Sequence, residues 1–272
     1  MCSLSAQRCP APRSYEELLA NWSTRLASGR GEGLLDDVAV GHAADVQRFL
    51  INTIEERRRL LTEELSLVAL ALEGFSELVT CYLREVPRIT FTPDYSDSQR
   101  FLRWLRRVWP LTAREADFVA YQEAEYACLA LARRERAAHV NFQQLLREGA
   151  SLPVSIAAGG DALAHLNPTR VWSRLAALSP TPEQDAVDAV FFAVGSQIRV
   201  AALAGPRATW LRTLSAVEPC SLRVWHARLQ NERCGCIAPA AFEAFVQELT
   251  DAGLVGIAPK NPGNNDEDST LS

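Results

Sequence analysis

The sequence of 272 residues contains only one lysine, Lys260, and only four histidines, and these absences limit its function. Proteins that neutralise nucleic-acid phosphates generally have a basic excess, whereas this chain has a formal net charge of −5. The four histidines are dispersed (positions 42, 139, 165 and 226), which is poor material for a His-rich iron site. No Gly-x-Ser-x-Gly elbow, P-loop or Gly-x-Gly-x-x-Gly fingerprint is present. The sequence therefore predicts no chemistry of these kinds in the chain itself.

Long apolar runs are also missing. The longest, Leu65 to Leu72, is far too short to cross a bilayer. The N-terminus lacks a charged segment followed by an apolar one, so a secretory signal is not expected. The seven cysteines are odd in number and scattered, which is typical of free thiols in a reducing compartment. We therefore expect a soluble, cytoplasmic protein.

The pattern of the N-terminal half predicts helices separated by short breaks. Ser14 with Glu17, and Thr112 with Glu115, form capping boxes, in which each side chain satisfies a free amide at a helix start. Apolar residues at helical spacing support the same assignment. We expect helices over about 14–28, 43–72, the segment between Gly74 and Pro87, 101–109 and 112–146, with a loop over 88–97.

Length and a hydrophobic content of 48% favour two domains. We expect a flexible arm over 1–13, a helical domain over 14–148 and a second domain over 168–258. Pro153 and the Gly159-Gly160 pair mark the linker between the two domains, over 149–167. The polar segment 259–272 is expected to be a disordered tail. The charged run 55–59 is expected on a solvated helix face with local ion pairs.

The second domain begins with a strong hairpin signal. Strands are expected over Val171–Leu178, Ala186–Val194 and Gln197–Leu203, with Gly195-Ser196 as a two-residue turn between the last two. This turn places Val194 opposite Gln197. We expect one face of the hairpin (Phe191, Ala193, Ile198, Val200) against the C-terminal helices. The other face (Phe192, Val194, Leu203) would then be covered by the N-terminal helical domain or by another protein.

Three helices and a short strand follow the hairpin. Pro206 and Pro239 lie at early helix positions that tolerate proline, Ser221 is placed to cap the second helix, and Gly253 to end the third. The third leads into a strand over Leu254–Ile257. This order is typical of a small winged helix-turn-helix. The fold class expected is mainly α with a small β-sheet, an N-terminal helical domain followed by a winged helix.

The block 168–258 resembles the RiPP recognition element, a PqqD-like winged helix that binds precursor peptides of ribosomally synthesised natural products. The resemblance lies in the element order, the short hairpin and the final helix with its ending, Phe245 to Leu254. The N-terminal half is similar to the helical domain of partner subunits encoded with multinuclear non-haem iron oxidases, including that of the thiaglutamate pathway. The residues that carry this second resemblance are Phe75, Leu78, Tyr82, Leu83, Pro87, Phe101, Leu102, Leu105, Ala120, Glu123, Ala124, Ala127 and Ala130.

The resemblance implies a peptide-binding adaptor in a heterodimer with a TglH-like iron oxidase. The iron would belong to that partner, and this chain would hold no catalytic residue, metal or cofactor and bind neither nucleic acid nor membrane. A carrier peptide ending in cysteine would add as a strand to the hairpin and pack against the third helix. The implied edge is Gln197, Ile198, Arg199, Val200, Ala201, Ala202 and Leu203, and the implied groove wall is Phe242, Phe245, Val246 and Leu249. Without any bound peptide, an ordinary solvent-exposed strand edge would explain the residues of 197–203 equally well, and packing in a core would explain the four helix residues.

Other functions remain open from the residues alone. A winged-helix DNA-binding regulator would need a basic third helix, but residues 239–252 contain Glu243, Glu248 and Asp251 and neither lysine nor arginine. A zinc site is conceivable from four possible ligands, although their spacing departs from a C-x₂₋₄-C knuckle: Cys220, His226, Cys234 and Cys236. A di-iron bundle would need two Glu-x-x-His pairs, and Glu123, Glu125, Glu135 and His139 supply none, so surface ion pairs are expected there.

Overall fold

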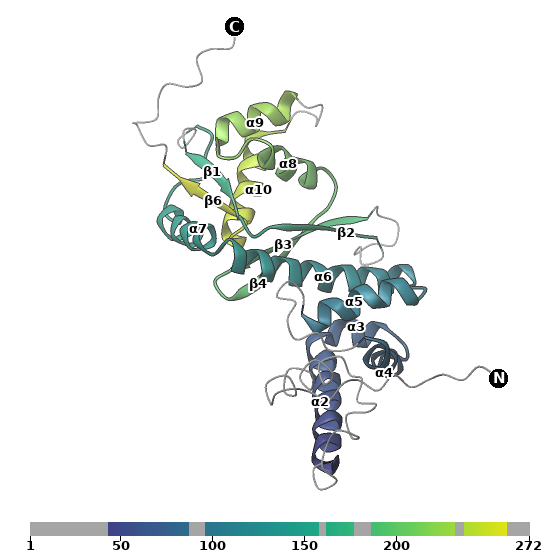
Figure 1. The fold of residues 1–272 in the computed structure, drawn as a ribbon. Helices are drawn as coiled ribbons and strands as arrows, with labels where there is room; N and C mark the ends of the chain where they lie inside the picture. Colours follow the sequence, from purple (N-terminus) through teal and green to yellow (C-terminus); the bar gives the residue numbers. More distant parts are fainter. Residues whose placement is uncertain (1–42, 87–95, 158–161, 177–185, 232–236, 260–272) are drawn as a thin grey trace, which may run out of the picture. The chain divides into compact units, whose positions relative to one another are not determined.

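The computed structural model describes residues 43–86, 96–157, 162–176, 186–231 and 237–259 (Figure 1). The chain divides into two compact units, Met1–Pro110 and Leu111–Ser272. In the described ranges helices predominate and the sheets are small and antiparallel, which confirms the coarse fold class. No helix in these ranges combines the length and apolar content needed to span a bilayer. The predicted arm, the helix over 14–28 and the tail after Pro259 lie outside them.

The first unit has four helices in its described part. The single helix expected over 43–72 is interrupted at Leu65, where the backbone leaves helical geometry at φ −107° and ψ 32°. The loop expected over 88–97 extends one residue too far, because the last helix begins at Asp97. Ser96 and Gln99 form the capping box that starts it. The helices are α2 (Ala43–Glu64), α3 (Ser66–Ala71), α4 (Phe75–Glu85) and α5 (Asp97–Val108).

An aromatic cluster forms the core of this unit. Phe75, Tyr82, Phe101 and Trp104 are buried on α4 and α5, and neighbouring rings pack with centroids 5.2–5.8 Å apart, mostly edge to face. Burying one side chain of this size contributes about 1.5–3 kcal/mol. The apolar stripes expected on these two helices therefore meet each other.

The charged run 55–59 behaves as expected except at Arg57. Arg58 and Arg59 form exposed ion pairs with glutamates on the same helix. The side chain of Arg57 is only 7% exposed and donates to both carboxylate oxygens of Asp97, at 2.7 and 3.0 Å. The hydroxyl of Tyr82 donates to the same carboxylate at 2.6 Å. Burial by itself raises the pKa of Asp97, but the hydrogen bonds from Arg57 and Tyr82 outweigh it and hold the pKa below its usual value.

The second unit contains two antiparallel sheets of three strands, in the orders β5-β1-β6 and β2-β3-β4, and five helices among its described residues. The helices that precede the sheets are α6 (Ala113–Arg134) and α7 (Arg136–Gly149). The remaining elements, in chain order, are β1 (Leu163–Leu166), β2 (Val171–Leu175), β3 (Val187–Val194), β4 (Gln197–Leu203), α8 (Pro206–Ser215), β5 (Cys220–Ser221), α9 (Leu222–Asn231), α10 (Pro239–Ala252) and β6 (Val255–Ala258).

The predicted hairpin is confirmed in its turn and its register. Val194 lies opposite Gln197 in β3 and β4, and the pairing continues to Asp188 opposite Leu203. Gly195 has a φ of 61°, and glycine with positive φ at the first turn position is typical of a type II′ turn. The predicted C-terminal glycine of α10 is also confirmed, since Gly253 has a φ of 83°.

The assignment of the two hairpin faces was wrong. The face that bears Phe191 packs against α6, where Tyr121 meets the Phe191 ring edge to face at 4.7 Å. The face that bears Phe192 joins the core formed with α8, α9 and α10. The helix α6 packs against the strands β2, β3 and β4 (Figure 1). Among the described residues, both faces of the hairpin are therefore packed within this unit, and β4 forms an edge of the sheet.

The helix expected over 112–146 breaks at Glu135, where φ is −97° and ψ is 35°. The break lets α6 lie on the β2-β3-β4 sheet while α7 packs against β6. These contacts place both helices with the sheets, so the compact units differ from the domain ranges expected over 14–148 and 168–258. The described part of the expected linker contains β1, which is the central strand of the other sheet.

Candidate functional site

The outer edge of β4 has no strand paired to it in the described part of the chain, because β4 is the last strand of the β2-β3-β4 sheet. Gln197, Arg199, Val200 and Ala202 are exposed along this strand, whereas Leu203 is buried. The side chain of Val200 is 37% exposed, which is high for a valine next to a packed sheet. The edge that the resemblance implied is therefore accessible in this structure.

The register determines which backbone groups of β4 point outward. In a hairpin with a two-residue turn, the residues that flank the turn exchange both hydrogen bonds, and every second pair repeats this arrangement. The bonded pairs then begin at Val194 and Gln197. The alternate residues Ile198, Val200 and Ala202 direct their N–H and C=O groups away from β3. These groups form a regular template for an added strand.

A buried polar cluster fixes the end of β3 against α10. Asn167 donates from its amide nitrogen to the carbonyl oxygens of Ala193, at 2.9 Å, and Gly253, at 3.1 Å. The Thr169 hydroxyl donates to the amide oxygen of Asn167 at 2.7 Å and accepts from the backbone N–H of Ala193 at 2.8 Å. The hairpin is thus held to the C-terminal end of α10 by specific hydrogen bonds as well as by apolar packing.

Arg199 lies between β4 and α10. Its guanidinium donates to the carbonyl oxygen of Ala252 at 2.8 Å, where the helix end carries partial negative charge. Beside it, Gln247 donates to the carboxylate of Asp251 at 2.8 Å. These groups border a hollow of about 290 Å³, which is lined by Leu146, Gly149, Ala150, Leu152, Val154, Val194, Arg199, Gln247, Thr250, Asp251 and Gly253.

The four residues implied as a groove wall are all buried in the core of the second unit: Phe242, Phe245, Val246 and Leu249. Phe242 packs against Trp225 with ring centroids 5.0 Å apart, and Phe245 packs against Trp210 at 5.2 Å. The part of α10 that borders the hollow next to β4 is polar instead. The four apolar residues Phe242, Phe245, Val246 and Leu249 follow an i, i+3, i+4, i+7 spacing, which is typical of a helix face packed in a core. This spacing in the sequence favoured their burial over a place in a groove.

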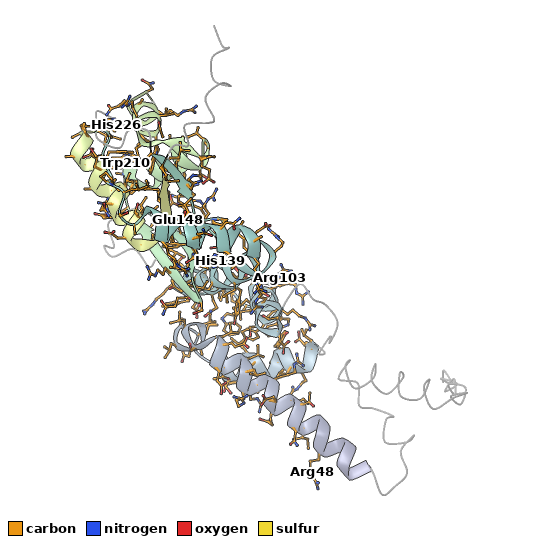
Figure 2. All side chains as sticks on the ribbon, turned by 90° about the vertical axis from the view of Figure 1, so that its left-hand side faces the viewer. Arg48, Arg103, His139, Glu148, Trp210 and His226 are labelled. Carbon is orange, nitrogen blue, oxygen red and sulfur yellow. The ribbon has the colours of Figure 1, made fainter. Side chains whose placement is uncertain are left out.

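Contacts between α7 and the tip of the hairpin were not predicted from the sequence. The backbone N–H of Gly195 donates to the side-chain oxygen of Gln143 at 3.1 Å, and the ring nitrogen Nε2 of His139 lies 3.3 Å from the Gly195 carbonyl oxygen. Figure 2 labels His139 on this helix. The two side chains come from more than fifty residues earlier in the chain.

The acidic side chains of α10 are engaged within the second unit. Glu248 pairs with Arg207 at 2.8 Å, and Glu243 accepts a hydrogen bond from the backbone N–H of Ile156 at 2.7 Å. No lysine or arginine lies on α10 to meet a phosphate backbone. The electrostatics of this helix therefore oppose its use as a DNA recognition helix.

The possible metal ligands do not gather in the described residues, where no group of three or more His, Cys, Asp or Glu side chains is close enough to hold an ion. Cys220 is buried, and burial raises the pKa of its thiol to about 11. His226 has Nε2 3.0 Å from the carbonyl oxygen of Ile237. Cys234 and Cys236 lie outside the described residues, so the zinc hypothesis is tested only in part.

Comparison of the chain with protein-family models, with curated proteins and with solved structures finds no match. The family resemblance drawn from the sequence therefore stays a prediction. A functional assignment has to rest on the geometry of the second unit, and above all on the free edge of β4 and the groups around it.

Proposed function

We propose that this chain is an adaptor without catalytic residues of its own, which binds a ribosomally synthesised precursor or carrier peptide. It presents the cysteine of that peptide to an iron-dependent oxidase in the biosynthesis of a natural product. The partner is a multinuclear non-haem iron oxidase, TglH-like in excising a carbon from a C-terminal cysteine, and the two proteins form a heterodimer. On this proposal, the hairpin and the helices α8, α9 and α10 constitute a PqqD-like winged helix.

The observation that carries the proposal is the free edge of β4. Three residues, Ile198, Val200 and Ala202, direct their backbone donors and acceptors outward, and no described strand uses them. A peptide that adds as a strand gains affinity from such main-chain hydrogen bonds, and its alternating side chains provide selectivity. This mode of binding needs no catalytic or charged constellation.

The rigidity of the hairpin supports the same function. Its two faces are packed, one against α6 and the other against the core formed by α8, α9 and α10. The edge is therefore ordered before a peptide arrives, and a preformed site avoids part of the entropic cost of binding. An adaptor of this kind aids catalysis because a tethered peptide reaches the partner enzyme at a raised local concentration.

The test uses Val200, whose N–H points away from β3. Val200→Pro removes this outward donor without removing a bond to β3, and proline is tolerated at such an edge position. Val200→Ala keeps the donor and serves as the matched control. Losing one main-chain bond and leaving its partner carbonyl unpaired costs about 2 kcal/mol, or roughly a thirtyfold loss of affinity.

The assay is affinity capture from the source organism with each variant as bait, followed by mass spectrometry. We expect the wild type and Val200→Ala to retain a short peptide that ends in cysteine together with an iron-containing enzyme. Val200→Pro should lose the peptide and keep the enzyme. Retention of neither partner by a folded wild type, or retention of DNA, would contradict the proposal.

A further inference from the structure

The helix α2 extends beyond the other helices of the first unit (Figure 1). It has 22 residues, whereas α4 has 11 and α5 has 12, so it is longer than α5 by about 15 Å. Arg57 and Leu61, in its second half, are buried. Before Arg57, none of the α2 side chains that the structure describes is buried. We call residues 43–56 the projecting part of α2, and Figure 2 labels Arg48 within it.

The projecting part continues the apolar face of the helix. Ile54 lies seven residues before the buried Leu61, so both residues belong to one face of α2. Ile54 is nevertheless 42% exposed, and Ile51, one turn earlier, is 52% exposed. Single exposed isoleucines are ordinary. A face that is buried in the second half of a helix and stays apolar in the first half indicates a further packing partner.

The sequence provides a partner of the right kind shortly before α2. Residues 14–28 lie outside the described part of the chain, and their sequence predicts an amphipathic helix that starts with a capping box. A helix of this length is only marginally stable alone in water, so its apolar face needs a surface to pack on. That face consists of Leu18, Leu19, Trp22 and Leu26.

We infer that residues 14–28 form a helix that packs on the projecting part of α2 and covers Ile51 and Ile54. The connecting residues 29–42, with glycine at 29, 31 and 33, can span up to about 50 Å when extended. The projecting part is only about 20 Å long, so the segment can reach all of it. A tethered segment is present at a high effective concentration, which favours it over a second copy of the chain or a partner protein.

The test is amide hydrogen exchange of the full chain, measured by mass spectrometry, with a synthetic peptide of residues 14–28 as the unpacked reference. We expect the segment to exchange at least about tenfold more slowly in the protein than in the peptide. Ile54→Asp should abolish this difference while α4 and α5 keep their protection. The matched control is Leu70→Asp, because Leu70 is 85% exposed on α3 of the same unit. It should change the exchange of the segment less than about twofold.

A second variant approaches the contact from the other side. Trp22→Asp should speed exchange in residues 48–56 of α2, and it leaves α2 itself unaltered if Ile54→Asp loosens the whole unit. Exchange of the segment as fast as in the peptide would refute the inference, and so would protection that survives both variants. Protection that rises with protein concentration would assign the face to a second copy instead. Protection of residues 48–56 that requires added cell extract would assign it to a partner, and either result overturns the inference.

Discussion

Replacing Asp97 by asparagine is expected to destabilise the first unit strongly, because it leaves the buried charge of Arg57 without a counter-charge. The Arg57 side chain is 7% exposed and its carboxylate partner 28% exposed. Asparagine keeps the shape of the side chain but retains only one acceptor oxygen, so one of the two hydrogen bonds from the guanidinium is lost. Removing one partner of a buried ion pair costs about 3–5 kcal/mol. The partial exposure of Asp97 places our expectation near 3 kcal/mol, at the lower end of that range.

Urea unfolding of the full chain measures this loss. The matched control is Glu56→Gln, which breaks an ion pair whose side chains are about half exposed and should cost less than about 0.5 kcal/mol. The pH dependence gives a second measurement. Since the folded pKa of Asp97 is depressed, its stabilisation is present above about pH 4 and is lost as the pH falls through the folded pKa. Equal, small losses for both variants would show that Arg57 is not held by a buried carboxylate.

Two further predictions concern the second unit and the thiols. Gly149→Ala should destabilise the protein by about 1–3 kcal/mol in thermal unfolding, although alanine favours helices, because the added carbon would lie 2.1 Å from a backbone carbonyl oxygen of β6; an unchanged melting temperature would contradict the α7–β6 packing. Native labelling with iodoacetamide should modify Cys81, which is exposed, and spare Cys128 and Cys220, which are buried. Burial raises the pKa of each buried thiol to about 11. Equal labelling of all three before denaturant is added would refute the burial assigned to them.

Local sequence signals were sufficient to predict those features of the fold that depend on residues close together in the chain. The Gly195-Ser196 turn determined the hairpin register, and the Thr112–Glu115 capping box determined the start of α6, as expected. The sequence missed β1 because its partners, β5 and β6, lie more than fifty residues away. It also reversed the two hairpin faces, because both are apolar and period-two alternation does not indicate which helix covers which face.

The candidate site was predictable only in part for the same reason. The edge strand is a local pattern, and its position at the edge of a sheet agrees with the expectation. Whether it binds a peptide stays a prediction. The contacts of His139 and Gln143 with the hairpin tip depend on the break at Glu135, which carries no proline or glycine signal. Arg57 looked like one of several surface charges, and only the tertiary contact with Asp97 distinguishes it.

An open edge strand is a hazard as well as a binding site, because it can pair with any other exposed strand. The surroundings of β4 limit that choice. On one side of the strand, Arg199 and the polar end of α10 border any added chain. On the other side, Ile198 packs against the cluster formed with α6, and Val200 is exposed. Successive side chains of a bound peptide would alternate between these two environments. A peptide that alternates polar and apolar residues in the correct register satisfies both, whereas a shift by one residue inverts every contact. On the proposed function, the edge of β4 would supply the affinity for the peptide, and the asymmetry of its two sides would set the register.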